Sequence, residues 1–384
     1  MHQITRHLSV DFDAGSSVLD MGRGARYLLT NSLFGSRLLC GDEDWETLAT
    51  YREPREPGSS SLEERAIQAR VLCPVGFRPS TSPLSERFKE VAEKLLKYRQ
   101  LEPAESLVEV AAQVKEICGP SREYEGDTHY LWQDPRRLFY IMMDHMSAYL
   151  ELELGTPQTA DLDFRFAQQS LGRPERNGEF AQQLCTLHTS LDRVRHIQER
   201  FPAPAKFLTL GDDDLMSLAL SRIPGYEVDV FEIDRSLVRF IKKRKPDTVR
   251  VFSRDLTNGL PAEFHHLYDA VLADPPYDAA GMSWFVRCCS QGLKRNSSSR
   301  LYLSTYPDLL ESSEQFFEEF GKNGLDLKQT TRHFNRYPFP TETHDITSVG
   351  LRNLGYHPEL VSVIMSVPYL YAHLFECEWL PGRL

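Results

Sequence analysis

Carboxylates gather in a short glycine turn near the middle of the chain. The stretch LTLGDDDLMSLAL holds an apolar run, then Gly211, then Asp212, Asp213 and Asp214. A glycine lets the chain bend sharply and lets a ligand approach the backbone. A phosphate site would hold further glycines, and three carboxylates would repel a diphosphate. The turn therefore predicts a cationic ligand, although Asp213 or Asp214 would also serve as a cap for the helix that follows.

Acidic residues also follow two later apolar runs. In VDVFEID, Glu232 lies 21 residues after Gly211, close to the spacing at which an acidic side chain accepts hydrogen bonds from ribose hydroxyls. Asp234 we expect to cap the next helix instead. In VFSRDLTNGLP, Asp255 would accept the exocyclic amine of adenine, or else form a local turn with its own backbone.

The fourth motif suggests transfer of a group to nitrogen. In DAVLADPPYD an apolar run is followed by Asp274, Pro275, Pro276 and Tyr277. The prolines fix the backbone, so the Asp274 carboxylate points rigidly into a site, where it can accept a hydrogen bond from an attacking N–H. The ring of Tyr277 can hold a cation or a flat group by its face.

Strands and helices alternate around these motifs. The predicted strands cover 206–211, 227–233, 248–252, 269–274 and 300–305, and the predicted helices cover 187–200, 214–222, 235–244 and 280–293. This alternation is typical of a doubly wound α/β fold with a parallel sheet. Ligands bind such sheets outside the carboxyl ends of the strands, near the topological switch point. All four motifs fall at such ends, so we expect them to form one site.

The pattern ahead of this region is mainly helical. Apolar spacing predicts helices at 85–100 and 104–118, which would form a hairpin. A third helix, from 134 to 154, is apolar almost all round. Such a helix could be buried in a homodimer interface or equally well in the core of a domain. We expect a homodimer. We predict an N-terminal domain over 1–130, a helical connector over 131–180 and a catalytic domain over 181–384. A winged-helix-like fold is one candidate for the N-terminal domain.

Composition excludes several classes of protein. The 384 residues are 41% hydrophobic, enough for a substantial core and for two domains. A net charge of -11 argues against a general nucleic-acid binder and suits a cationic or neutral small substrate. Seven cysteines without a CxxC pair indicate reduced thiols in a cytoplasmic protein, and they predict no bound metal. Without a signal core or a run of 18 apolar residues, we expect neither secretion nor membrane insertion.

The order of the motifs, GDDD, then EID, then DPPY, resembles the branched-chain polyamine synthase family, that is, the N4-bis(aminopropyl)spermidine synthases. LGDDDLMSLAL and LADPPYD look like that family's two signature motifs. The segment QQLCTLHTSLDRVRHI is similar to a further family stretch through Gln183, Thr186, Thr189 and Arg193. The resemblance covers roughly 175–310 and implies a Rossmann-like fold of the class I methyltransferase type. The first 130 residues and the tail depart from the family pattern.

The resemblance implies an aminopropyltransferase. Such an enzyme moves an aminopropyl group from decarboxylated S-adenosylmethionine, a co-substrate rather than a resident cofactor, to a small cationic amine, by default a polyamine. By motif position, Asp214 matches the aspartate to which the family's catalysis is assigned, and the residues from Asp274 to Tyr277 line the amine site. We therefore expect Asp214, helped by Asp274, to receive the proton of the attacking amine.

The donor would lie across the other motifs. Glu232 and Asp255 would hold its adenosine, Gly211 would allow close approach, and Asp212 or Asp213 would hold its ammonium. An acidic turn would attract that ammonium and repel the carboxylate of intact S-adenosylmethionine. The alternative is an N-methyltransferase or amino-carboxypropyl transferase that uses intact S-adenosylmethionine on a small amine or peptide. A polyamine-binding protein with an inactive site is a third, non-enzymatic possibility.

Overall fold

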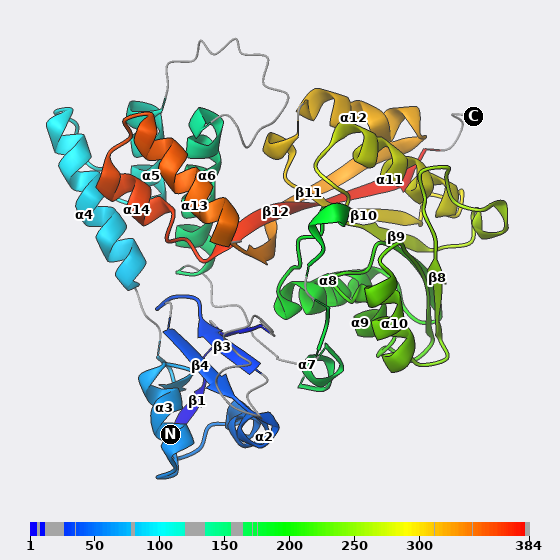
Figure 1. The fold of residues 1–384 in the computed structure, drawn as a ribbon, viewed down its shortest axis with the longest axis horizontal. Helices are drawn as coiled ribbons and strands as arrows, with labels where there is room; N and C mark the ends of the chain where they lie inside the picture. The colour runs from blue at the N-terminus through cyan, green and yellow to red at the C-terminus, as the bar shows by residue number, and fades with distance from the viewer. Residues whose placement is uncertain are drawn as a thin grey trace. The chain divides into compact units, whose positions relative to one another are not determined.

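The chain packs into two compact units (Figure 1). A computed structural model describes residues 1–5, 8–11, 27–34, 36–77, 81–119, 135–154, 164–170, 172–174, 176–310, 312–339 and 341–380. One unit contains Met1–Leu162 and Pro338–Leu370, and the other contains Asp163–Tyr337 and Tyr371–Leu384. The predicted domains, over 1–130, 131–180 and 181–384, stay a prediction. By packing alone, residues 338–370 group with the N-terminal part of the chain.

The first unit combines small sheets with helices. Its strands are β1 (His2–Ile4), which pairs with β5 (Leu72–Pro74), and a meander of β2 (Leu8–Asp11), β3 (Tyr27–Asn31) and β4 (Ser36–Cys40). Its α-helices in the described ranges are α2 (Asp42–Ala49), α3 (Ser61–Gln68), α4 (Pro83–Tyr98), α5 (Leu107–Cys118), α6 (Pro135–Leu152), α13 (Thr341–Asn353) and α14 (Pro358–Ile364). The predicted hairpin is confirmed, since α4 packs on α5. An α+β N-terminal part was predicted, and this unit has that composition.

The second unit is built on a seven-stranded sheet. The strands are β6 (Ala205–Leu210), β7 (Tyr226–Glu232), β8 (Val249–Ser253), β9 (Ala270–Ala273), β10 (Arg300–Thr305), β11 (Leu325–Pro338) and β12 (Tyr369–Trp379). Their order across the sheet is β11-β12-β10-β9-β6-β7-β8, with β6 to β10 parallel and β12 antiparallel to β10. When these seven strands are numbered 1 to 7 along the chain and the sheet is followed from β8 to β11, the order is 3-2-1-4-5-7-6. This is the strand order of the class I methyltransferase fold. The predicted fold class is therefore confirmed.

Helices cover both faces of this sheet (Figure 1). They are α7 (Phe164–Ser170), α8 (Leu187–Arg200), α9 (Met216–Leu220), α10 (Arg235–Arg244), α11 (Ala279–Gly292) and α12 (Ser313–Lys322). The strands and helices predicted for this unit all appear, and their bounds lie within two residues of those expected. The parallel strands are apolar runs because both of their faces are buried. One large core joins β6, β9 and β10 to α11 and α12 through Leu208, Val271, Leu301, Val286 and Phe316.

Caps in the sequence fix where the helices around the site begin. Thr186 accepts a hydrogen bond from the backbone N–H of Thr189 at 3.3 Å and starts α8. Asp278 accepts one from Gly281 at 2.7 Å and starts α11 directly after the DPPY motif. Such side chains satisfy N–H groups that a helix leaves unpaired at its first turn. The caps therefore hold the strand–helix loops, which carry the motifs, in fixed conformations.

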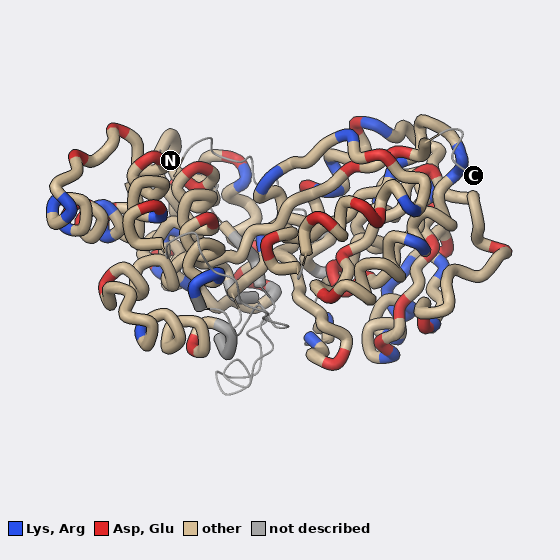
Figure 2. The backbone as a smooth tube through the Cα atoms, turned by 90° about the horizontal axis from the view of Figure 1, so that it is seen from above, with Lys and Arg blue, Asp and Glu red and all other residues tan. Residues whose placement is uncertain are grey.

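Charge is distributed over both units. Figure 2 shows Asp and Glu interspersed with Lys and Arg along the backbone of each. Acidic residues are therefore not confined to one part of the backbone, and any acidic site has to be identified from its own residues. Within the described ranges, the helices are all too short or too polar to cross a bilayer.

Candidate active site

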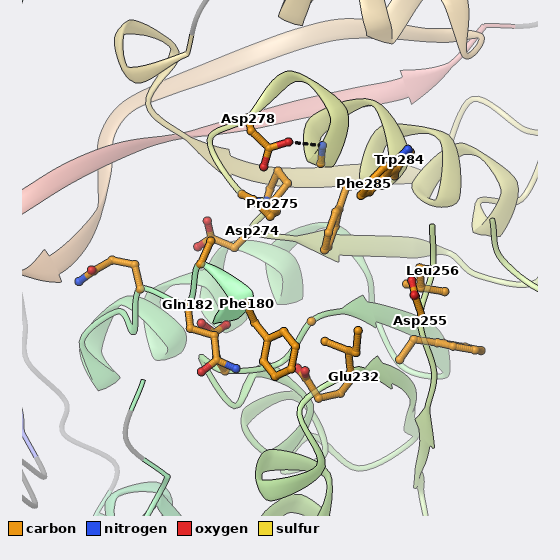
Figure 3. A pocket seen from close by; sticks show the side chains of 18 of the residues that line it. Phe180, Gln182, Glu232, Asp255, Leu256, Asp274, Pro275, Asp278, Trp284 and Phe285 are labelled. Atoms are coloured by element: carbon orange, nitrogen blue, oxygen red, sulfur yellow. Dashed lines mark hydrogen bonds between the residues drawn. The ribbon is translucent and has the colours of Figure 1, made fainter. Parts of the chain in front are cut away.

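A cavity of about 300 Å³ lies at the carboxyl ends of β6, β7, β8 and β9 in the second unit (Figure 3). Among the described residues that line it, the acidic ones are Glu179, Asp213, Glu232, Asp255, Asp274 and Asp278, and the basic one is Arg254. Apolar and aromatic groups complete the wall: Phe180, Ile233, Leu256, Tyr277, Trp284 and Phe285. A largely apolar cleft with a few placed polar groups is typical of small-molecule sites. This one favours a cationic ligand with a flat part.

Gly211 makes the turn that begins the site. Its φ of +72° lies in the left-handed region, where a side chain would strain the backbone. The N–H of Gly211 donates to the carbonyl of Phe231 at 2.9 Å, which ties the turn to the end of β7. Gly211 lines the cavity as predicted. After this bend, Asp213 lines the cavity, whereas Asp212 and Asp214 are buried outside its lining.

Asp212 stabilises the start of α9, whose N-cap residue is Leu215. Its carboxylate accepts hydrogen bonds from the backbone N–H of Ser217, at 3.1 Å, and from the Ser217 hydroxyl. The side chain is buried and lies outside the cavity lining. Burial raises the pKa of Asp212 to about 8. The expectation that Asp213 or Asp214 would cap this helix is wrong, because Asp212 reaches the helix start after the chain has turned.

Asp214 is held inside the protein. One oxygen, Oδ1, accepts from the backbone N–H of Cys185 at 2.7 Å, and Oδ2 forms an ion pair with Nη1 of Arg193 at 2.7 Å. The residue is 3% exposed and is absent from the cavity lining. Both oxygens are therefore engaged by protein donors. Asp214 therefore belongs to the buried charge network outside the cavity lining, and its role as proton acceptor stays a prediction.

Asp213 is the aspartate of the turn that lines the cavity. Its backbone carbonyl accepts from Nη1 of Arg173 at 3.4 Å. Its carboxylate accepts no hydrogen bond from any residue that the structure describes. Burial, and then the charges of Asp214 and Asp274, raise the pKa of Asp213 well above its usual range. A carboxylate in this situation gains most from a cation that enters the cavity.

Asp274 supplies the second available oxygen. Its Oδ2 accepts from Nη2 of Arg193 at 3.1 Å and from the hydroxyl of Tyr337. Its Oδ1 has no donor among the described residues. Burial raises the pKa of Asp274 to about 7, helped by the charge of Asp214 and opposed by Arg193 and the Tyr337 hydrogen bond. In Figure 3, Asp274 and Pro275 lie on the opposite side of the cavity from Asp255.

The remaining DPPY residues complete that side. Pro275, Pro276 and Tyr277 line the cavity as predicted. Burial and the charge of Asp274 raise the pKa of the Tyr277 hydroxyl, so it stays protonated at neutral pH. The motif thus provides one carboxylate, one aromatic ring and a rigid backbone.

Arg193 connects the two acidic motifs. It is 5% exposed and pairs with both Asp214 and Asp274. Its Nε donates to Oδ1 of Asn335 at 2.8 Å, and its Nη2 donates to the Tyr337 hydroxyl at 2.9 Å. A buried cation needs such partners. The sequence analysis placed Arg193 in a family segment but missed Asn335 and Tyr337. These two residues lie on β11, more than 140 residues after Arg193, and no motif in the sequence links them to it.

Glu232 has the position expected for a ribose ligand. Its Oε2 accepts from the N–H of Asp212 at 2.9 Å and its Oε1 from the N–H of Asp234 at 2.8 Å. The side chain is buried, lines the cavity, and has its pKa raised by that burial. Each oxygen retains a lone pair that a ribose hydroxyl can use. Asp234 caps α10 through Ser236 at 2.7 Å, which confirms its predicted role.

Asp255 forms the local turn considered for it and also lines the cavity, so its role toward adenine stays a prediction. Its Oδ1 accepts from the N–H of Thr257 at 2.8 Å, which forms the local turn. The residue also lines the cavity, beside the apolar Leu256 (Figure 3). Its second oxygen has no hydrogen bond from a described residue. That oxygen is available to a base that lies against Leu256.

A loop before α8 closes the remaining side, and sequence reasoning missed most of it. Phe180 and Gln182 line the cavity, together with Gln183 of the family segment. The Gln182 amide accepts from the N–H of Asn177 at 2.7 Å and donates to Oδ2 of Asp234 at 3.2 Å. The loop is therefore fastened to the strand end that carries the ribose candidate. No spacing signal marks such an irregular segment.

Comparison with known families identifies this part of the chain. Residues 161–351 match the family model described as the branched-chain polyamine synthase A C-terminal domain. This region of the chain belongs to the branched-chain polyamine synthase family. The matched residues include every described residue that lines the cavity, so the family likeness and the cavity coincide. The predicted family is confirmed.

Individual relatives agree over shorter stretches. The N(4)-bis(aminopropyl)spermidine synthase of Thermococcus kodakarensis is 33% identical over 129 residues, 32% of this chain and 36% of that one. Its counterpart in Methanocaldococcus jannaschii is 31% identical over 133 residues, 33% and 38% of the two chains. The matches to these curated relatives span little more than a third of their length.

Among solved structures, the branched-chain polyamine synthase from Thermus thermophilus, in complex with N4-aminopropylspermidine and 5'-methylthioadenosine, is 18% identical with a TM-score of 0.48. That alignment covers 77% of this chain and 93% of the other. At this level of likeness, the fold assignment rests on the strand order itself.

Proposed function

We propose that this protein is an aminopropyltransferase. It would move an aminopropyl group from decarboxylated S-adenosylmethionine to a polyamine. The observation that carries the proposal is the pair Asp213 and Asp274, two half-buried carboxylates with unengaged oxygens in an acidic cavity. A pair of this kind is suited to cationic amines. The names of the relatives, which are bis(aminopropyl)spermidine synthases, support the same activity.

The donor would lie with its adenosine at the β7 and β8 strand ends. Glu232 would accept hydrogen bonds from the ribose, and Asp255 from the exocyclic amine of the base. Ile233, Leu256 and Phe285 supply apolar contacts for the ring. Asp213 would hold the positive end of the donor. Intact S-adenosylmethionine would place its own carboxylate in the same acidic surroundings, where a like charge costs several kcal/mol.

The transfer needs one proton acceptor. The lone pair of the acceptor nitrogen forms a bond to the carbon beside the sulfonium, while the carbon–sulfur bond breaks and its electron pair stays on sulfur. The products are a neutral thioether, 5'-methylthioadenosine, and an alkylated ammonium, which loses its proton. Oδ1 of Asp274 would take that proton, because it faces no protein donor and because its pKa near 7 suits proton transfer at neutral pH. Alignment of nitrogen, carbon and sulfur would supply much of the rate.

Donor choice tests the proposal against its alternative, an N-methyltransferase or amino-carboxypropyl transferase. The protein is incubated with spermidine and either donor, and products are read by mass. We expect aminopropyl adducts with decarboxylated S-adenosylmethionine, and tighter binding of that donor by calorimetry. Methyl or amino-carboxypropyl adducts from intact S-adenosylmethionine would overturn the proposal. Binding without turnover of either donor would favour the non-enzymatic possibility. The homodimer and the cytoplasmic location stay predictions.

A further inference from the structure

Tyr337 stands at the junction of the cavity and the buried charge network. It is 3% exposed and lines the cavity. Its hydroxyl donates to Oδ2 of Asp274 and accepts from Nη2 of Arg193 at 2.9 Å. The same Nη2 donates to the same Oδ2 at 3.1 Å. Three groups thus close a ring of hydrogen bonds around one carboxylate oxygen.

We infer that Tyr337 is a positioning residue, which fixes Oδ2 of Asp274 so that Oδ1 remains for the acceptor amine. This inference rests on the proposed aminopropyl transfer. With one oxygen held by two donors, the Asp274 carboxylate has one orientation, and its other oxygen is the one that a ligand can reach. Tyr337 acts through Asp274 and needs no contact with the reacting atoms.

The strand β11 is what makes this position rigid. Asn335 and Tyr337 are two residues apart, so they project from the same face of β11. Both reach Arg193, Asn335 through Nε at 2.8 Å and Tyr337 through Nη2. Asn335 also donates to the carbonyl of His373 on β12 at 3.0 Å. A site held by paired strands keeps its geometry better than one held by loops.

The charges around Asp274 set the sign of the effect. The groups that act on it or share its cluster are Arg193 from α8, Asp213 and Asp214 from the turn after β6, Tyr277 from its own loop and Tyr337 from β11. The Tyr337 hydrogen bond stabilises the ionised carboxylate and so lowers the pKa of Asp274. Removal of that hydroxyl should therefore raise the pKa and leave less of the base ionised at neutral pH.

Tyr337→Phe tests the role, with Tyr302→Phe as its matched control. Tyr302 is also buried in the second unit, but its hydroxyl has no hydrogen-bond partner among the described residues. We expect Tyr337→Phe to lower kcat at pH 7 about tenfold or more and to move the acid limb of the kcat profile upward by about 1 to 2 pH units. Donor affinity by calorimetry should stay within about threefold, and the control should match the wild type.

A second variant keeps the ring and the fold. Site-specific 3-fluorotyrosine at position 337 is a stronger donor of the same shape, so the acid limb should move downward. The inference is overturned if Tyr337→Phe folds and keeps the wild-type kcat and pH profile. It is also overturned if fluorination leaves the limb unmoved or moves it upward.

Different results would refute the proposed function and the positioning role of Tyr337. A wild-type protein that makes no aminopropyl adduct refutes the proposed function. In that case the carbon-13 carboxyl signal of Asp274, identified by its loss in Asp274→Asn, still tests Tyr337. An upward shift of its titration in Tyr337→Phe supports the positioning role, and an unchanged titration refutes it.

Discussion

Adjacent aspartates in one turn should respond in opposite ways to the same substitution. Asp214→Asn removes one partner of a buried ion pair that is 2.7 Å long, while Asp213→Asn removes a carboxylate that no described donor contacts. Loss of one partner from a buried pair typically costs about 3 to 5 kcal/mol. Because Arg193 keeps Asp274 at 3.1 Å, we expect the lower end for Asp214→Asn, about 3 kcal/mol.

Thermal unfolding measures this difference. For a unit of this size, about 3 kcal/mol lowers Tm by roughly 6 to 12 °C. Asp213→Asn removes a carboxylate whose ionisation is opposed by burial, so its Tm should equal or exceed that of the wild type. Its affinity for decarboxylated S-adenosylmethionine should instead fall by about 1.5 to 3 kcal/mol, or roughly 10- to 150-fold, as expected for a lost hydrogen bond to a charged group.

The comparison has a clear contrary outcome. Suppose that Asp214→Asn melts like the wild type and loses turnover, while Asp213→Asn keeps both donor binding and turnover. Asp214 would then be the aspartate that meets the ligand, and the engagement of its oxygens by Arg193 and Cys185 would be irrelevant to function. Asp212→Asn, at the start of α9, serves as a control that should alter stability more than ligand affinity.

Four further results are expected. The pKa of Asp274 is raised to about 7, so the native state binds more protons than the unfolded state between about pH 4 and 7. The free energy of unfolding should therefore fall by up to roughly 4 kcal/mol as pH rises across that window. In urea titrations, Asp274→Asn should abolish this part of the pH dependence. Over the same range kcat should rise with pH, since the base must be ionised, and a flat profile would exclude Asp274 as the proton acceptor. Glu232→Gln cannot accept both backbone N–H groups, so donor affinity by calorimetry should fall about 10- to 100-fold with a loss of about 1 to 3 kcal/mol in stability, and unchanged affinity would remove Glu232 from the donor site. Gln182→Ala releases the loop from Asp234, so KM for the donor should rise several-fold with little change in kcat, and a selective fall in kcat would contradict a purely binding role.

The parallel part of the fold was predictable because its strands are buried on both faces. Such strands read as apolar runs that alternate with amphipathic helices, and β6 to β10 were found on that basis. β11 was missed. It lies at the edge of the sheet, and its sequence LDLKQTTRHFNRYP is polar because much of it is exposed. Edge strands carry charge for this reason, so hydrophobic patterning does not report them.

The site was predictable in its parts but not in its connections. Sequence placed Glu232, Asp255 and Asp274 at strand ends, and all three line the cavity. It could not tell which aspartate of the turn meets the ligand. That choice depends on Arg193, 21 residues before Asp214, and on partners that the fold brings from β11. Contacts of such long sequence separation leave no local spacing to detect.

The charge balance around Arg193 explains why the turn has three carboxylates. Asp212 contacts the start of the helix, so the acidic groups in or beside the Arg193 cluster are Asp213, Asp214 and Asp274, of which Asp214 and Asp274 pair with the Arg193 guanidinium. Two negative charges remain uncompensated when all three are ionised, and burial raises the pKa of both Asp213 and Asp274 in response. A donor with a sulfonium and an ammonium supplies two positive charges, whereas the carboxylate of intact S-adenosylmethionine cancels one of them. Under the proposed function, this imbalance would favour the decarboxylated donor and would also raise the proton affinity of Asp274.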